Sequence, residues 1–181
     1  AGNRAVLTIG TVAGLRPEKN VARLIRAFAA VRARHPARLV IVGDGPQRSA
    51  LESLARELGV ASEVEFAGYQ ANPLDWLATF DLFGLSSDTE QLPLSMLEAM
   101  ACGVPVVATR VGDVPDIMPR EAAGNLSEPE DSAFSASLLA AIERRTDWPA
   151  WVEAGYAQLH RHYGPERMRA DWQRVFDGEW W

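Results

Sequence analysis

The sequence predicts an α/β fold: a doubly wound parallel sheet, covered by helices on both faces, followed by a helical C-terminal tail. Short apolar runs alternate with segments of helical periodicity over residues 6–109. The run 104–109 (VPVVAT) is apolar at nearly every position, which is typical of a parallel strand buried on both faces. Residues 132–176 carry helical periodicity. Between the run 104–109 and this tail, the only strand signal is a weak one at 125–126. Such alternation of strand and helix places parallel strands in one three-layer domain.

The first half of the chain is expected to hold two strand–helix units. A strand at 6–12 is followed by a helix whose apolar stripe recurs at spacings of three and four, and a strand at 38–42 (RLVIV) by a second such helix. Gly59 ends the second helix as a C-cap. The two stripes are Val21, Leu24, Ile25 and Phe28, and Leu51, Leu54, Ala55 and Leu58.

The second half continues the alternation and then becomes helical. Gly103 stops the helix expected before the strand at 104–109, and the acidic run SEPED introduces the first tail helix. Trp180 and Trp181 end the chain, and we expect them either to dock on a partner domain or to fray. Strands are expected at 64–67 and 81–85, and helices at 73–79, 93–102, 132–144, 151–162 and 165–176.

Composition indicates one soluble domain. Apolar residues make up 48% of the 181 and charged residues 23%, and no apolar run reaches the roughly 18 residues of a membrane span. The single Cys102 forms no internal disulfide, which favours a reducing, cytoplasmic compartment. Because the chain opens without Met, almost directly on a strand, we expect a domain taken from a longer protein.

Charge is distributed unevenly along the chain. Residues 1–60 hold ten Lys/Arg and four Asp/Glu, whereas residues 61–181 hold eight and twenty. The basic third is compatible with an anionic ligand or an anionic membrane face, although on charge alone a solvated Arg-rich helix face is the better explanation. The net charge of −6 argues against nucleic acid as a partner.

Polar and glycine-rich segments follow the strands, where doubly wound sheets bind their ligands. Arg16 and Lys19 follow the first strand in GLRPEKN, and cations at a helix start are unfavourable unless an anion lies there. After the second strand comes a turn that allows a ligand to approach the backbone, made of Gly43, Asp44, Gly45 and Pro46.

The segment after the fourth strand is the most informative. Glu90 precedes a helix that begins near Pro93, and Glu98 follows eight positions later, inside that helix. The N-terminus of such a helix can receive a diphosphate. A carboxylate near it can accept hydrogen bonds from ribose hydroxyls, so Glu98 is a candidate for that contact.

At this point the chain resembles the C-terminal, donor-binding domain of the retaining GT-B glycosyltransferases of the group 1, or family 4, type. The resemblance covers about residues 6–145 and rests on IGTVAGLRPEKN, LVIVGDGPQRSALESLARELG, VEFAGY, DLFGLSSDTEQLPLSMLEAMACGVPVVAT and VGDVPDI, in this order. It implies a Rossmann-like sheet, a nucleotide-sugar donor (UDP-, GDP- or ADP-sugar), and neither metal nor cofactor. Residues 1–181 would then form one domain that transfers sugar poorly without its N-terminal acceptor domain.

The resemblance also implies residue roles. Glu98 would hold the ribose, Glu90 would lie near the donor sugar, and Lys19 would bind the diphosphate, helped by Arg16. The other residues expected to line the donor pocket are Gly14, Gly43, Gly45, Pro46, Gly68, Tyr69, Leu92, Pro93 and Leu94. A role in polysaccharide biosynthesis, with peripheral contact to the inner face of the membrane, follows from the family alone.

Two positions depart from the family pattern. Gly14 stands where the family often has Arg, and Gln91-Leu92-Pro93 where it often has Gly-Phe-Gly; Pro93 lacks an N–H to offer the sugar. These departures leave open a non-catalytic nucleotide-binding module. A related sugar-nucleotide epimerase domain is a separate alternative, and the Glu90–Glu98 element with the Glu-Lys-Asn turn favours a transferase over it. A dinucleotide dehydrogenase is disfavoured, because G-x-G-x-x-G is absent after the first strand.

Overall fold

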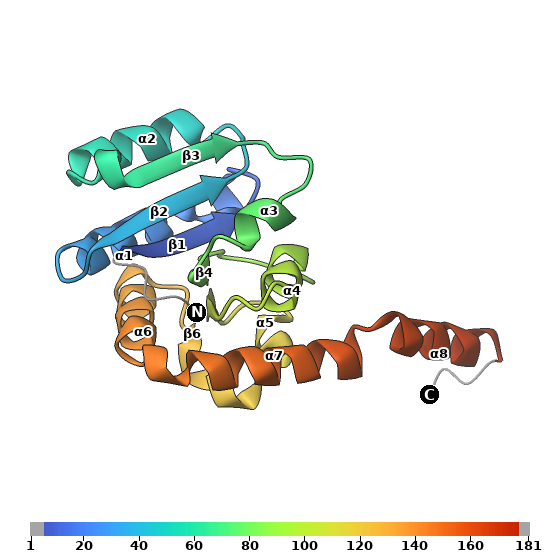
Figure 1. Cartoon of the computed structure of the whole chain (residues 1–181). Coiled ribbons are helices and arrows are strands. Elements are labelled where there is room, and N and C mark those ends of the chain that lie inside the picture. The colour runs from blue at the N-terminus through green and yellow to red at the C-terminus, as the bar shows by residue number, and fades with distance from the viewer. Residues whose placement is uncertain (1–5, 178–181) are drawn as a thin grey trace.

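Six parallel strands form one central sheet in the computed structural model of the chain, which describes residues 6–177 (Figure 1). The strand order is β3-β2-β1-β4-β5-β6, so the order reverses between β1 and β4. This is the doubly wound Rossmann-like arrangement that the sequence predicted. The strands are β1 (Leu7–Val12), β2 (Ala37–Val42), β3 (Val64–Gly68), β4 (Leu82–Leu85), β5 (Val106–Thr109) and β6 (Leu126–Ser127).

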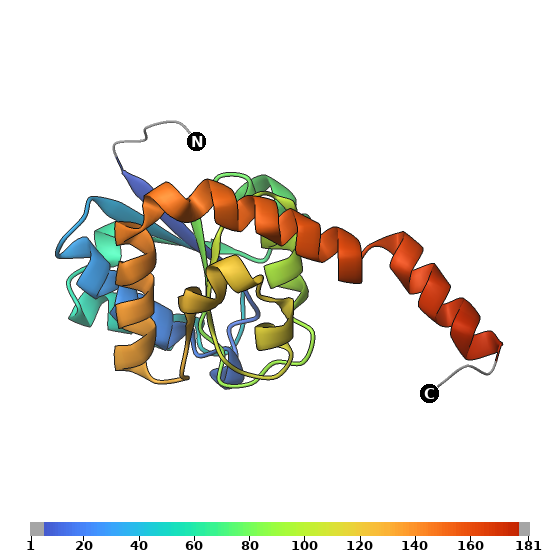
Figure 2. The ribbon, with the colours of Figure 1, turned by 90° about the horizontal axis from the view of Figure 1, so that it is seen from below.

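Helices cover both faces of this sheet (Figures 1 and 2). One face carries α1 (Val21–Arg32) and α6 (Asp131–Glu143), which pack against each other, with α2 (Arg48–Glu57) next to α1. On the other face, α4 (Leu94–Ala101) packs against both α3 (Leu74–Leu77) and α7 (Trp148–His162). The remaining helices are α5 (Val114–Ile117), α8 (Pro165–Phe176) and the 3₁₀ turns η1 (Pro17–Lys19), η2 (Ala61–Glu63), η3 (Arg120–Asn125) and η4 (Arg145–Asp147).

The core lies where these helices meet the sheet. The predicted stripe of α1 is buried: Leu24, Ile25 and Phe28 have no exposed surface, and Val21 has 3%. Phe83 of β4 and Phe134 of α6 are equally buried. Burial of a large apolar side chain contributes roughly 1.5–3 kcal/mol, so this interior holds the sheet edge in place.

Two boundaries differ from the sequence prediction for identifiable reasons. The strand expected at 104–109 begins at Val106, because Pro105 has no N–H to give to a ladder. The helix expected from Trp151 begins at Trp148, since Pro149 suits a first helical turn. The strand signal at 125–126 corresponds to β6, which has only two residues.

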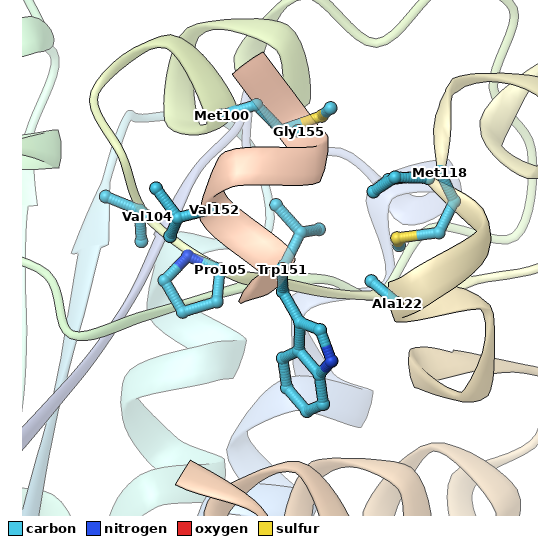
Figure 3. Close-up of a pocket in the computed structure, with 10 residues that line it drawn as sticks. Met100, Val104, Pro105, Met118, Ala122, Trp151, Val152 and Gly155 are labelled. Atoms are coloured by element: carbon cyan, nitrogen blue, oxygen red, sulfur yellow. The ribbon is translucent and has the colours of Figure 1, made fainter. Parts of the chain in front are cut away.

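The tail divides into a packed helix and a projecting one. Helix α7 lies across the domain, and its Trp151 is 4% exposed. Figure 3 shows the seam between α7 and the body of the domain. A cavity of only about 10 Å³ remains there, beside Met100, Met118 and Trp151. Helix α8 extends away from the body and buries none of its residues (Figure 2). Trp180 and Trp181 lie outside the described residues. Within 6–177, no helix has the length and apolarity to cross a membrane.

Candidate functional site

A pocket opens at the carboxyl edge of the sheet, where the strand order reverses. It has a volume of about 370 Å³. The loops after β1, β2, β3 and β4 and the first turn of α4 form its walls. Ligands of doubly wound sheets bind in this crevice. The lining residues are Val12, Ala13, Gly14, Lys19, Val42, Gly43, Asp44, Tyr69, Gln70, Glu90, Leu92, Pro93, Leu94 and Ser95.

The loop after β1 is locked onto the loop after β4. Asn20 adopts a left-handed conformation (φ 39°) and caps α1 by accepting a hydrogen bond from the Arg23 N–H. Its side-chain amide donates to Asp88 at 3.1 Å, and the Ser86 hydroxyl donates to the Asn20 carbonyl at 3.0 Å. An Asn tolerates this conformation better than most residues, so the turn brings Lys19 to the segment that carries Glu90.

Lys19 and Glu90 form the charged centre of the pocket. The Lys19 ammonium lies 2.8 Å from each carboxylate oxygen of Glu90, and the Ser87 hydroxyl donates to Oε1 of Glu90 at 2.6 Å. The Glu90 side chain is 6% exposed and that of Lys19 30%. Behind them, the Thr109 hydroxyl donates to the Ser87 carbonyl at 2.6 Å. The carboxylate is thus held in one orientation by charge-assisted bonds.

Two glycines allow neighbouring loops to support these residues. A Cβ on Gly43 (φ 134°) would lie 1.9 Å from the Ala13 carbonyl oxygen, and one on Gly112 (φ 51°) 1.8 Å from the Glu90 carbonyl oxygen. No side chain fits at either distance. The turn at Gly112, which the sequence gave no reason to distinguish from an ordinary loop, therefore supports the Glu90 backbone directly.

The N-terminus of α4 forms a further wall. Pro93 caps the helix and is buried, and the next residues, Leu94 and Ser95, line the pocket. The N–H groups of these first helical residues have no acceptor within a helix. Together with the helix dipole they favour an anion at this end of α4.

Arg16 is a second cation beside the pocket. Its Nε lies 3.9 Å from the position that a Cβ on Gly14 would take, and Gly14 is itself part of the pocket wall. No ion pair joins Arg16 to another residue within 6–177. Asp44, in contrast, is paired with Arg48 at 3.3 Å. The Arg16 guanidinium is thus available to a ligand. It lies close to the place that a side chain at position 14 would occupy.

Glu98 lies one turn beyond the N-terminus of α4. It forms part of the wall of a second, mostly apolar hollow of about 430 Å³, together with Tyr156 of α7 and Tyr163, the C-cap of that helix. Glu98 is half-buried. Burial raises the pKa of the adjacent Cys102 thiol, and the Glu98 charge raises it further. Glu98 borders this hollow and stays a candidate for ligand contact.

The pocket brings together most of the predicted residues and leaves some outside. Eight of them line it: Gly14, Lys19, Gly43, Tyr69, Glu90, Leu92, Pro93 and Leu94. Arg16 and Glu98 lie next to it, as described above. Gly45 and Pro46 belong to the turn that leads into α2, and Gly68 accepts a hydrogen bond from the Gly43 N–H at 2.8 Å. The roles of all these residues stay predictions.

Three supporting residues were not anticipated from the sequence. Ser87 and Thr109 connect Glu90 to β5, and the buried Arg23 binds the Ser86 carbonyl and Asp88. For the supporting role of Arg23, the only signal in the sequence was the position of an arginine beside the apolar stripe of α1. No cluster of three or more His, Cys, Asp or Glu side chains within 6–177 has a metal-binding arrangement.

Known proteins are similar to this chain in sequence and in fold. The family described as "Glycosyl transferases group 1" matches residues 5–144. N-acetyl-alpha-D-glucosaminyl L-malate synthase of Bacillus anthracis is 35% identical over 168 residues, which cover 93% of this chain and 41% of that protein. The lipopolysaccharide core biosynthesis glycosyltransferase LpsD of Rhizobium meliloti is 36% identical, covering 88% and 46%. The chain thus spans less than half the length of these curated relatives.

Solved structures agree with the sequence relatives. The crystal structure of HepE from Anabaena in complex with UDP superposes with a TM-score of 0.76 at 26% identity, covering 87% of this chain and 45% of that one. TarM of S. aureus shares the fold at a TM-score of 0.82 and 22% identity, covering 93% and 35%. The chain therefore belongs to the group 1 glycosyltransferases and has the architecture of their C-terminal, donor-binding domain.

Proposed function

We propose that this domain binds a nucleoside-diphosphate sugar in the pocket around Lys19 and Glu90 and serves as the donor half of a retaining glycosyl transfer. The observation that carries the proposal is that Lys19, Glu90 and the N-terminus of α4 meet in one pocket, at the edge where the strand order of the sheet reverses. The UDP complex of the HepE relative supports the choice of ligand.

The diphosphate is best accommodated between the β1 loop and α4. It would bring two to three negative charges, which Lys19, the unpaired Arg16 and the first N–H groups of α4 can balance. These groups would also stabilise the charge that develops on the leaving diphosphate during transfer. We therefore propose that no metal ion and no further cofactor takes part.

The two carboxylates suit the neutral hydroxyl groups of the donor. Glu90 lines the pocket, so its carboxylate could accept hydrogen bonds from sugar hydroxyls, and Glu98, one helical turn along α4, would accept those of the ribose. The base would then lie along the outer wall formed by Tyr69, Gln70 and Leu94. Tyr69, with 77% of its surface exposed, offers a face for stacking.

The acceptor is expected to bind to a second domain. The curated relatives are more than twice as long as this chain, so their names describe larger proteins. On projecting α8, the side chains of Met168, Trp172 and Phe176 are exposed, and the last two stack at 5.9 Å. This apolar stripe suits contact with such a domain, and we expect the present domain alone to bind donor without transferring sugar.

We further propose a cytoplasmic enzyme of polysaccharide biosynthesis that is peripherally attached to the inner face of the membrane. The name of the LpsD relative and the basic first third of the chain support this assignment. The anionic lipids of a cytoplasmic leaflet attract such basic surfaces. A sugar-nucleotide epimerase is less well supported, because both curated relatives described above are named for synthase or glycosyltransferase activity.

Calorimetric titration with UDP, GDP and ADP tests the proposal. We expect one of them to bind, and Glu98→Ala to weaken binding by about tenfold or more, since a carboxylate that accepts two hydroxyl bonds is lost. Glu153→Ala is the matched control, because Glu153 is an exposed glutamate on α7 and should leave binding unchanged. Failure of folded protein to bind any of the three nucleotides would contradict the proposal.

A further inference from the structure

We infer that the chain has a further ligand site, a polar cavity between α7 and the segment α5–η3, and that this cavity takes the phosphate ester of a sugar. We call it the α7 cavity. It has a volume of about 700 Å³, against about 370 Å³ for the donor pocket, and the two share no lining residue. The inference goes beyond the proposed function and does not depend on it.

Two firmly attached walls form the α7 cavity. Helix α7 supplies one wall, and α5 with the start of η3 supplies the other. Each wall is fixed to the interior: Trp151 of α7 is 4% exposed, and Met118, which follows α5, is 6% exposed. The side-chain amide of Gln158 on α7 donates a hydrogen bond to the Asp116 carbonyl of α5 at 2.9 Å. The cavity therefore does not depend on a free loop for its shape.

Three basic side chains line this cavity from both walls. Arg120 comes from η3, and Arg161 and His162 come from the last turn of α7. All three are exposed, so a ligand can reach them. None of them forms an ion pair within the part of the chain that the structure describes, whereas seven other arginines there do. Their donors are thus available to an anionic ligand.

A phosphate monoester fits these basic side chains. It carries between one and two negative charges at neutral pH and has three acceptor oxygens. A guanidinium group binds phosphate through two parallel N–H donors, and an imidazole N–H adds another. Because Arg120 and Arg161 stand on opposite walls, they can hold the phosphate from two sides.

Two acidic side chains in the same cavity favour a sugar on that phosphate. Asp116 and Glu121 also line the cavity, and neither has an ion pair among residues 6–177. Ionised carboxylates only accept hydrogen bonds, so they repel a ligand that is anionic throughout. The hydroxyl groups of a sugar are neutral donors that suit them. A cavity of about 700 Å³ lies within the usual range for small-molecule sites.

Titration of the chain followed by amide NMR spectra tests the inference. The probes are glucose 1-phosphate and glucose 6-phosphate, and the reference ligands are glucose and inorganic phosphate. We expect a sugar phosphate to shift the amide signals of residues 115–121 and 154–162, and to bind more tightly than either reference ligand. An absence of shifts, or shifts confined to the donor pocket around residues 12–19 and 90–95, would overturn the inference.

Arg161→Gln tests the role of the basic side chains. It should weaken binding of the sugar phosphate by about fivefold or more, because one charged contact is lost. Arg169→Gln is the matched control: Arg169 is an exposed arginine of α8 that does not line the cavity, and its loss should leave the affinity unchanged. Equal losses for the two variants would mean that only general charge attracts the ligand, and the inference would be wrong.

Glu121→Gln tests the role of the acidic side chains. Without the Glu121 charge, inorganic phosphate should bind more tightly, while the sugar phosphate gains less because it already offers hydroxyl donors. The preference for the sugar phosphate should therefore narrow, and an unchanged preference contradicts the inference. Nucleotide binding is read separately on the donor pocket, so a failure of the proposed function is distinguishable from a failure here.

A phosphorylated sugar can be soluble or can be the headgroup of a lipid. Phosphatidylcholine vesicles that contain phosphatidylinositol 4-phosphate, whose headgroup is a phosphorylated polyol ring, distinguish the two sources. Co-sedimentation that Arg161→Gln reduces and Arg169→Gln does not would assign the α7 cavity to a lipid headgroup. Binding of the soluble probes without co-sedimentation would assign it to a free sugar phosphate. Binding of neither overturns the inference.

Discussion

At the scale of single residues, the environment of a side chain determines its chemistry. Cys102 follows the last turn of α4, is half-buried, and lies close enough to Glu98 for that carboxylate to act on it. Burial and then the Glu98 charge raise the pKa of the thiol, because both disfavour the thiolate. A thiol with a raised pKa has little reactivity at neutral pH.

This leads to a prediction on the pH dependence of alkylation. Only the thiolate reacts, so iodoacetamide should modify Cys102 more slowly than free cysteine at pH 8. Glu98→Gln removes one of the two causes and lowers the thiol pKa, which should raise the rate at a given pH and move the rate–pH curve to lower pH. Glu57→Gln, an exposed position on α2 at the other face of the sheet, should not move it. An unmoved curve for Glu98→Gln would show that Glu98 does not act on Cys102.

At the scale of elements, the buried Arg23 connects three segments. From α1 its guanidinium donates to the Ser86 carbonyl after β4 at 2.8 Å, and it pairs with Asp131 at the start of α6 at 3.3 Å. It also pairs with Asp88 at 2.8 Å and donates to the Pro129 carbonyl. One side chain thus holds the Glu90 loop and α6 against α1.

Removing this connection should destabilise the domain. We expect Arg23→Met to lower the free energy of unfolding by about 2–3 kcal/mol, because buried carbonyls lose a charged donor. Arg26→Met is the control: Arg26 pairs with the same Asp131 but is 47% exposed, and its loss should cost about 0.5 kcal/mol or less. Urea denaturation followed by circular dichroism measures both. Equal losses in the free energy of unfolding for the two variants would mean that the burial of Arg23 adds nothing to stability.

At the scale of the whole molecule, the tail contains two helices with different dependence on the body. Trp151 on α7 fills the seam shown in Figure 3. The Arg144 guanidinium lies over its ring, with the guanidinium carbon 5.2 Å from the ring centre. Trp172 on α8 is 56% exposed and contacts the neighbouring Phe176. The same residue type therefore serves packing in one helix and remains available for contact in the other.

The two tryptophans should respond differently to truncation. Trp151→Ala leaves a cavity under α7, and we expect it to lower the free energy of unfolding by about 3–5 kcal/mol. Trp172→Ala should change it by about 0.5 kcal/mol or less, because no packed interior depends on this side chain. Thermal and urea unfolding of the chain would measure both values. A large loss for Trp172→Ala would mean that α8 packs on the body in solution.

The sequence by itself determined the architecture and the edge of the sheet at which the candidate pocket lies. Strands and helices impose different periodicities on their apolar residues, and alternation of the two leaves few topologies besides a doubly wound sheet. Because ligands of such sheets bind beyond the carboxyl ends of the strands, the sequence directed attention to Lys19, Glu90 and Glu98, of which the first two line the candidate pocket. β6 was only faintly indicated, since two residues carry too little pattern.

Only the tertiary structure decided how these residues are paired. Lys19 and Glu90 lie 71 positions apart, and no local pattern could show that they share two hydrogen bonds at 2.8 Å. The same holds for Thr109 behind Ser87, for Gly112 against the Glu90 carbonyl, and for the burial of Arg23. Each of these depends on the meeting of segments distant in sequence. Periodicity records which face of an element is buried, whereas contacts between loops arise only when the whole sheet assembles.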